Sequence, residues 1–256
     1  MAQLIFLGTA AALPEQHRTN TSLAVVDEAA TRGLLIDCGG DVYGALCRSG
    51  LVPDVIDDVL ITHAHIDHIG SLPSLLESFR LGGRTRALRI LAIPEVLSVA
   101  QRLVSVFDFE ITLDNWTFPV TFQPVTPGEQ MELAGIPVTC YRMDHTVPSV
   151  GVRMELTQGT IAYTSDTQPN PTLRQLAQGA RLLITECTFL KSGEPHARSS
   201  RHMTTVDAGR AASEAQAHTL VLVHQGPWSA DLARAEIREV FAGDVVIPAD
   251  GDRIVV

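Results

Sequence analysis

Four side chains that bind metal ions in proteins lie within six residues of this sequence. The segment from His63 to His68 reads His-Ala-His-Ile-Asp-His and follows the apolar run Val-Leu-Ile at residues 59–61. His63 and His65 are two positions apart, so an extended backbone points both imidazoles the same way. Asp67 and His68 come where the chain turns, so they can approach from another side. One tetrahedral ion would not need so many groups from a single loop, and the segment therefore predicts two metal ions.

Short β-rich runs alternate with helical stretches, which predicts an α/β domain with helices outside the sheets. A helix over 69–81 has Leu72, Leu75, Leu76 and Phe79 at helical spacing and predicts a core-facing stripe. Thr204 stands three positions before Asp207, the pattern of a capping box. The predicted strands are 3–7, 22–26, 33–37, 58–62, 88–92, 138–143, 150–156, 160–164, 181–186, 219–223, 244–247 and 253–256. The predicted helices are 42–49, 69–81, 95–107, 172–178, 206–217 and 230–241.

Composition narrows the class of protein. The 256 residues are 45% hydrophobic and 19% charged, and we find no linker or repeat, so we expect one domain over 1–256. A net charge of −10 argues against a long nucleic acid or an anionic membrane as partner. The four cysteines form no CxxC pair, and we expect reduced thiols in or near the core. The apolar start has no Lys or Arg before it, so we expect a cytoplasmic protein.

The pattern His-x-His-x-Asp-His resembles the signature of the metallo-β-lactamase-fold hydrolases. The resemblance implies a four-layer αββα sandwich with a one- or two-metal site at one edge of its two sheets. In this superfamily the remaining ligands come later in the chain in the order His, Asp, His, and His145, Asp166 and His224 match them, each at the end of a predicted strand. The resemblance implies one ion held by His63, His65 and His145. It implies a second ion held by Asp67, His68 and His224, with Asp166 bridging the two.

Charge arithmetic limits the substrate of such a centre. Two divalent ions, less two carboxylates and a shared hydroxide, leave about one positive charge. The centre therefore suits a singly charged anion such as a phosphodiester, or a polarised carbonyl.

Several segments resemble the ribonuclease Z group within that superfamily. The opening Phe-Leu-Gly-Thr at 6–9, followed by Arg18 and Asn20, is similar to the group's first motif. Thr-Glu-Cys-Thr-Phe at 185–189 and His-Met-Thr at 202–204 resemble its second-half signature. The resemblance implies that Glu186 orients or polarises His202, which acts near the scissile phosphate. It also implies that Arg18 and Asn20 face the substrate.

The sequence departs from ribonuclease Z at two places. His145 and Asp166 are 21 positions apart, which leaves no room for the long arm that grips tRNA in that group. His224 is followed by Gln-Gly-Pro-Trp, whereas the group has a Phe-Ser-x-Arg-Tyr type of segment. Both departures favour a smaller phosphodiester, as in the armless cyclic-phosphate phosphodiesterases.

We therefore expect a metal-dependent phosphodiesterase that acts on small phosphodiesters or cyclic phosphates. In this hypothesis Asp67 and Asp166 orient a hydroxide shared by the two ions, and His202 protonates the leaving oxygen. An esterase, lactonase or aryl sulfatase on the same centre, a ribonuclease Z-type nuclease, a glyoxalase-type thiol-ester hydrolase and a non-catalytic metal-binding protein are the alternatives. Zinc is the expected metal, with manganese or iron also compatible. Substrate-selecting loops are expected at 107–116 and 226–229, and a homodimer is compatible with the sequence.

Overall fold

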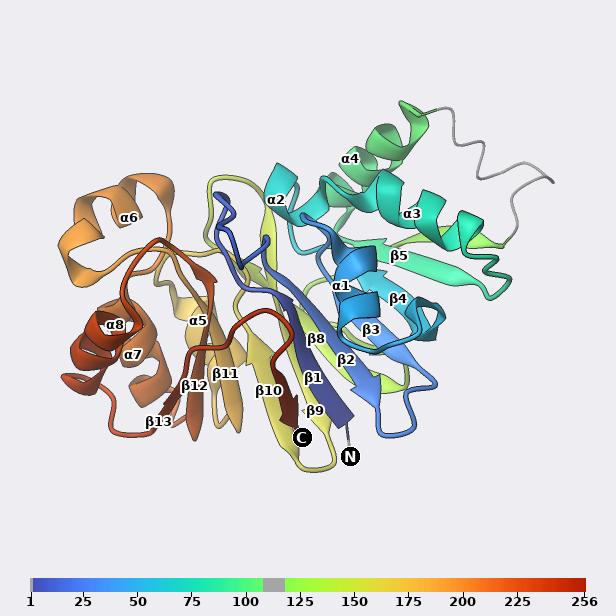
Figure 1. The fold of residues 1–256 in the computed structure, drawn as a ribbon. Coiled ribbons are helices and arrows are strands. Elements are labelled where there is room, and N and C mark those ends of the chain that lie inside the picture. The colour runs from blue at the N-terminus through green and yellow to red at the C-terminus, as the bar shows by residue number, and fades with distance from the viewer. Residues whose placement is uncertain (1, 108–117) are drawn as a thin grey trace.

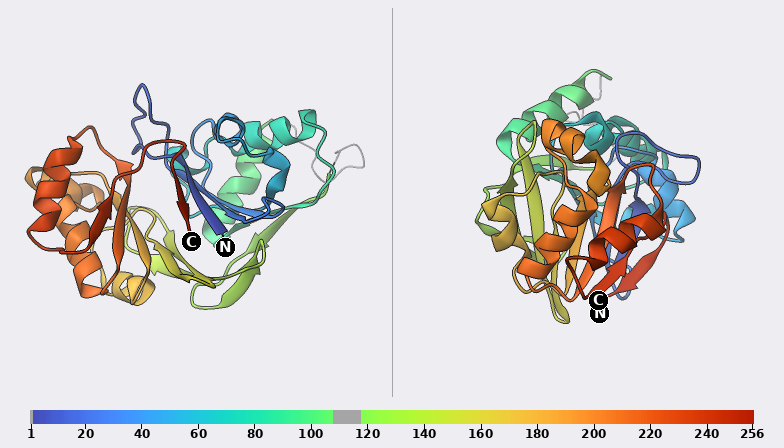
Figure 2. Two further views of the ribbon diagram at one scale, coloured as in Figure 1. Left: turned by 60° about the horizontal axis from the view of Figure 1, so that its bottom comes forward. Right: turned by 90° about the vertical axis from the view of Figure 1, so that its left-hand side faces the viewer.

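The computed structural model describes residues 2–107 and 118–256. Two seven-stranded β-sheets lie face to face, and helices cover the outer face of each (Figure 1). Figure 2 shows the same layers from two further sides, with a group of helices on either flank. The predicted four-layer αββα sandwich is confirmed.

The first sheet contains strands from the N-terminal half of the chain and the final strand. In spatial order its strands are β14 (Arg253–Val255), β1 (Ala2–Gly8), β2 (Ser22–Asp27), β3 (Gly33–Ile36), β4 (Ile56–Leu60), β5 (Leu88–Ala92) and β6 (Val120–Pro124). The pairs from β14 to β3 are antiparallel, and those from β3 to β6 are parallel.

The second sheet repeats this arrangement with the C-terminal half. Its strands in spatial order are β13 (Asp244–Val246), β12 (Thr219–Gln225), β11 (Leu182–Cys187), β10 (Gly159–Tyr163), β9 (Ser149–Leu156), β8 (Ile136–Met143) and β7 (Gln130–Leu133). The pairs from β7 to β10 are antiparallel, and those from β10 to β13 are parallel. Strand β12 is a nearly continuous apolar run because both faces of this parallel region are covered.

Eight α-helices lie in the described part of the chain. They are α1 (Val42–Arg48), α2 (Ile66–Ile69), α3 (Leu72–Leu81), α4 (Pro94–Ser105), α5 (Pro171–Ala177), α6 (Glu194–Ser200), α7 (Thr205–Glu214) and α8 (Ala230–Arg238), with short 3-10 turns at Pro53–Val55 and Lys191–Gly193. The predicted capping box begins α7: the Thr204 hydroxyl accepts the Asp207 N–H, and the Asp207 carboxylate accepts the Thr204 N–H. The predicted apolar stripe of α3 is buried.

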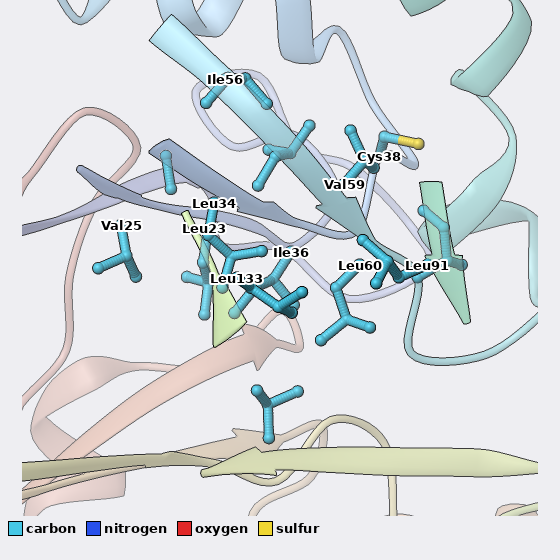
Figure 3. Packing of buried hydrophobic residues seen from close by; sticks show 14 of the residues in the cluster. Leu23, Val25, Leu34, Ile36, Cys38, Ile56, Val59, Leu60, Leu91 and Leu133 are labelled. Atoms are coloured by element: carbon cyan, nitrogen blue, oxygen red, sulfur yellow. The ribbon is translucent and has the colours of Figure 1, made fainter. Parts of the chain in front are cut away.

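The main hydrophobic core lies between the two sheets. Figure 3 shows Leu23 and Val25 of β2 and Leu34 and Ile36 of β3 gathered with Leu133 from the opposing sheet. All five are fully buried. Residues two apart on a strand share a face, so each strand gives the core alternate side chains. A second cluster packs β10, β11 and β12 against α5, α7 and α8.

The structure corrects several predicted elements. The helix predicted over 69–81 begins later, at Leu72 of α3, because the Ser71 N–H bonds to the Cys38 carbonyl, and Ile69 ends the separate short helix α2. Strands β6 and β7 and helix α6 were not predicted. Three cysteines are buried, whereas Cys47 is exposed on α1. Of the predicted substrate loop at 107–116, residues 108–116 lie outside the described residues.

Parallel strands place their carboxyl ends at one edge of each sheet, and the two edges come together between α2 and α6 (Figure 1). The N- and C-termini lie side by side at the opposite end, where β1 pairs with β14. Among the described residues, no helix has the length and apolar character needed to cross a membrane.

Candidate metal centre

Strand ends position most of the predicted ligands. His63 and His65 follow β4, and the short helix α2 carries Asp67 and His68. His145 and Asp166 follow β8 and β10, which run in the same direction because both pair antiparallel with β9. His224 is the penultimate residue of β12. All seven side chains therefore reach the shared edge of the two sheets, in two groups.

The first group contains His63, His65, His145 and Asp166, whose candidate ligand atoms all lie within 4.8 Å of one another. Nε2 of His145 is 3.1 Å from Nδ1 of His65. Oδ2 of Asp166 is 3.6 Å from Nε2 of His63 and 3.9 Å from Nε2 of His145. These separations are those of atoms facing a common point, as ligands of one ion do.

The second group contains Asp67, His68, Asp166 and His224, again with candidate ligand atoms within 4.8 Å. Nε2 of His224 lies 3.2 Å from Oδ2 of Asp166 and 3.3 Å from Oδ2 of Asp67. Nε2 of His68 lies 3.4 Å from Oδ2 of Asp166. Asp166 belongs to both groups, which is the place of a bridging carboxylate. The arrangement is consistent with a dinuclear metal site.

Buried polar atoms in both groups lack a partner, which fits a cation between them. Nε2 of His63, Nε2 of His68 and Oδ1 of Asp166 are buried without a hydrogen bond. A buried polar atom left unpaired is costly, so such atoms call for a ligand. Nitrogen and carboxylate oxygen are donors that zinc and neighbouring first-row metals accept. The residues present therefore fit two divalent ions.

Burial and neighbouring carboxylates shift the pKa values of the first-group histidines and of His68 in opposite directions. Burial holds the pKa of His63 well below its ordinary value and lowers the pKa of His65 and His145, which keeps their ring nitrogens available as ligands. Burial would also lower the pKa of His68, but the carboxylates of Asp166 and Asp37 raise it well above the ordinary value. The same two carboxylates would favour a metal cation at Nε2 in place of the proton.

Asp37 is a buried residue of the site that the sequence analysis missed. Its Oδ2 accepts hydrogen bonds from Nδ1 of His68 and from Oγ1 of Thr62, both at 2.8 Å. Since that Thr62 hydroxyl donates to Asp37, it is free to accept from Nδ1 of His63, 3.1 Å away. Asp37 thus fixes one ligand of each group with Nε2 facing the centre, a usual role for partners behind metal-bound histidines.

Glycine permits this close approach of the Asp37 segment. A Cβ on Gly39 would lie 1.5 Å from the backbone oxygen of Asp67. The run Asp-Cys-Gly-Gly at 37–40, directly after a predicted strand, was the signal available in the sequence.

Glu186 and His202 form a hydrogen-bonded pair beside the second group. Nδ1 of His202 lies 2.8 Å from Oε1 of Glu186, which is fully buried in β11. Oε2 of Glu186 accepts the Thr188 hydroxyl at 2.9 Å, and that hydroxyl lies 2.8 Å from Nδ1 of His224. Burial would lower the pKa of His202, but the Glu186 carboxylate outweighs it and raises the pKa to about 9. The imidazole is therefore protonated at neutral pH.

The two predicted substrate residues, Arg18 and Asn20, lie on the loop between β1 and β2. The Arg18 guanidinium bonds to Oε1 of Gln225, the neighbour of His224, and to Glu15. Arg18 thus contacts the residue after a predicted ligand, and its contact with a substrate stays a prediction. The Asn20 amide donates to the carbonyls of Ala11 and Ala12, so it holds the loop together, and its contact with a substrate stays a prediction.

Left-handed backbone conformations gather around the centre. Asp37, Ser165, Arg201 and His224 have φ values of 64°, 53°, 55° and 51°. Residues other than glycine reach this region only when surrounding contacts hold them there, and such residues cluster at functional sites. Four of the seven such residues in the described chain adjoin the predicted ligands, which supports the assignment of this edge as the functional site.

Residues 32–225 match the family described as the beta-lactamase superfamily domain. The chain belongs to this superfamily. Its place is in the ribonuclease Z-like branch: a ribonuclease Z from Bradyrhizobium sp. (strain ORS 278) is 25% identical over 307 residues, with 100% of both chains covered. Membership of the superfamily and the two His/Asp groups together make the protein a metal-dependent hydrolase of this fold.

Solved structures with the same fold agree over nearly the whole chain. The metallo-beta-lactamase fold protein YhfI from Bacillus subtilis has a TM-score of 0.85 and 25% identity, covering 99% of this chain and 98% of that one. Zinc-bound PqqB from Methylobacterium extorquens has a TM-score of 0.79 and 18% identity, with 99% and 100% covered. A diphosphatase of the PhnP family has a TM-score of 0.72 and 21% identity, with 100% and 98% covered.

Proposed function

We propose that this protein is a phosphodiesterase of small phosphodiesters or cyclic phosphates that works with two zinc ions. The Glu186–His202 pair beside the two ligand groups carries the proposal. A zinc-bound neighbour of the same fold supports zinc as the metal. Neighbours and relatives named as a diphosphatase and as ribonuclease Z support a phosphorus centre as the point of attack.

His202 supplies the acid for such a reaction. Its Nδ1 is committed to Glu186, so the proton available to a substrate is on Nε2. Hydrolysis of a phosphodiester forms one phosphorus–oxygen bond to the oxygen of water and breaks the bond to the leaving oxygen. That leaving oxygen takes the Nε2 proton, and the Glu186 carboxylate at Nδ1 favours the protonated imidazole.

The other residues position the reactants. Bound divalent ions would lower the pKa of a water molecule and neutralise charge on the phosphoryl oxygens. Asp67, whose Oδ2 faces His224 and His68, accepts a hydrogen bond from the attacking water and orients it. Arg18, beside Gln225, offers a positive charge to the non-bridging oxygens.

The segment between His145 and Asp166 supports a small substrate. It is a plain hairpin in which β9 pairs with β10 from Gly159 to Tyr163. This described part of the chain therefore contains no insertion that could form a tRNA-gripping arm. The net charge of −10 also disfavours a polyanion.

A panel of substrates tests the proposal. Purified protein loaded with zinc, manganese or iron is offered a bis-nitrophenyl phosphodiester, a 2′,3′-cyclic nucleotide, a lactone, a thiol ester and an aryl sulfate. We expect the phosphodiester and cyclic phosphate to have the highest kcat/KM, and the activity to vanish in Asp67→Ala. Preference for the lactone, thiol ester or sulfate would assign the centre to those esters instead. Metal binding without turnover of any substrate would indicate a non-catalytic protein.

A ribonuclease Z-type nuclease is the second candidate, because the relative of that name covers the full chain. A precursor tRNA with a 3′ extension belongs in the same panel. Cleavage of that RNA with a kcat/KM above that of the small diesters would favour this candidate over ours.

A further inference from the structure

Arg201 ends helix α6 next to His202, and its backbone conformation is unusual. The residue is the C-cap of α6 with φ 55° and ψ 49°, in the left-handed region that glycine normally fills. A residue other than glycine is disfavoured in this left-handed conformation unless other contacts hold it there. Backbone N–H groups of Arg201 and His202 bond to the Ala197 carbonyl of α6, and further contacts of Arg201 reach the segment that carries the predicted ligand His145.

Arg201 holds the His145 segment at two points. Its backbone carbonyl lies 3.0 Å from Nδ1 of His145. A carbonyl only accepts hydrogen bonds, so this contact requires the proton of the imidazole to be on Nδ1. Its guanidinium Nη1 donates to the His145 carbonyl at 3.0 Å and to Oδ1 of Asp144 at 3.1 Å.

The two contacts have complementary effects. The carbonyl selects the tautomer of His145 that leaves Nε2 free, and Nε2 is the atom that faces His65 and Asp166. The guanidinium fixes the distance between the C-terminus of α6 and the loop after β8, and so keeps the carbonyl within reach of the ring. Backbone bonds to the Ala197 carbonyl close the left-handed C-cap itself, so the side chain is needed only to hold this cap against the loop after β8.

We infer that Arg201 is a positioning residue for one of the two metal ions, the one predicted at His63, His65 and His145. The inference rests on the proposed metal centre. Arg201 contacts none of the ligands of the second group, and His224 in that group has a separate partner, the hydroxyl of Thr188. The contact of Arg201 is thus confined to a ligand of the first group, so the two ions should respond differently to its substitution.

Metal binding tests this independently of activity. Wild type, Arg201→Ala, Arg201→Gly and Arg201→Lys are titrated with zinc against a chelator of known affinity, and zinc per chain is measured. We expect Arg201→Ala to keep one ion at wild-type affinity and to bind the other about 10- to 100-fold more weakly. Arg201→Lys should recover part of the loss, since an ammonium can replace one of the two donated bonds.

Arg201→Gly separates positioning from backbone strain. Glycine adopts the left-handed C-cap without cost, so this variant should be at least as resistant to unfolding as Arg201→Ala. If the guanidinium is what matters, the zinc affinity of Arg201→Gly falls as in Arg201→Ala. Recovery of wild-type affinity in the glycine variant would overturn the inference, since backbone conformation alone would then account for the effect.

Two controls complete the experiment. Arg174→Ala removes an exposed arginine that pairs with Glu214 on the protein surface, and both ions should bind as in wild type. Long-range ¹H–¹⁵N spectra of the metal-free protein should show His145 as the Nδ1–H tautomer in wild type. In Arg201→Ala they should show a mixture of the Nδ1–H and Nε2–H tautomers. A single Nδ1–H form in both proteins would contradict the inference. Wild type that binds no zinc at all would instead refute the proposed metal centre.

Discussion

Nδ1 of His202 lies 2.8 Å from the buried carboxylate of Glu186, and the same carboxylate accepts the backbone N–H of Thr167 at 2.9 Å. Thr167 directly follows Asp166, the residue shared by the two ligand groups. One carboxylate therefore orients the imidazole that would protonate the leaving group and also fixes the backbone beside the bridging ligand. A substitution at Glu186 should affect both.

His202→Ala should lower kcat according to the leaving group. For a poor leaving group such as an alkoxide, loss of a general acid typically costs about 10²- to 10⁴-fold. For nitrophenolate, which leaves without a proton, we expect little change. Comparing kcat for the two classes of diester checks this, with zinc per chain measured as the control. Equal losses on both substrates, at unchanged zinc content, would remove the acid role from His202.

Asp166→Ala should abolish binding of both ions, because this carboxylate faces both groups. His65→Ala should weaken only the ion of the first group. Metal that binds only the native state stabilises it, by about 2.7 kcal/mol when free metal is 100 times its Kd. A chelator should therefore lower the melting temperature of wild type and leave that of Asp166→Ala unchanged. A wild-type level of zinc in Asp166→Ala would disprove the bridging role.

Asp37→Ala should weaken metal binding although Asp37 is not a predicted ligand. The substitution removes the carboxylate that accepts hydrogen bonds from Nδ1 of His68 and from the Thr62 hydroxyl. Loss of such an outer partner typically lowers metal affinity by about 10- to 100-fold. Asp37→Asn is the matched control, because asparagine tolerates the left-handed conformation and keeps one acceptor oxygen. We expect zinc affinity in the order wild type, Asp37→Asn, Asp37→Ala. An affinity of Asp37→Ala equal to wild type would show that His68 needs no such partner.

The predicted ligands could be placed from the sequence because their types are rare and their positions regular. Histidines two apart after an apolar strand indicate a site at the end of that strand. The resemblance to the superfamily then supplied His145, Asp166 and His224, which its later ligands match. The outer partners could not be predicted in this way. The glycines after Asp37 mark a close approach without showing what approaches, and Thr188 carries no such mark, so the roles of both residues follow from which strands become neighbours. Arg201 is recognisable only through its φ and its contacts.

The elements that were missed lack a periodic apolar pattern. Helix α6 reads Glu-Pro-His-Ala-Arg-Ser-Ser, and Ala197 is its one buried residue. Strand β6 is only partly buried along its length, so its side chains do not alternate clearly. The later start of the helix predicted at 69–81 depends on a tertiary contact, the Ser71 N–H to Cys38 carbonyl bond. Such elements are set by packing and remote contacts, which a local pattern does not contain.

Asp207→Asn should lower the free energy of unfolding at pH 7 and make that free energy less sensitive to a fall in pH. Burial would raise the pKa of Asp207, but bonds from Arg198 and from the Thr204 N–H and hydroxyl outweigh it and lower the pKa. A carboxylate with a lowered folded-state pKa stabilises above its unfolded pKa of about 3.8, and the contribution is lost as pH falls through the folded value. We expect a cost of about 1 kcal/mol at pH 7 that shrinks toward pH 3. Urea unfolding of metal-free protein at both pH values measures it, with Glu214→Gln on the same helix as control; a difference that stays constant with pH would exclude the charge as its cause.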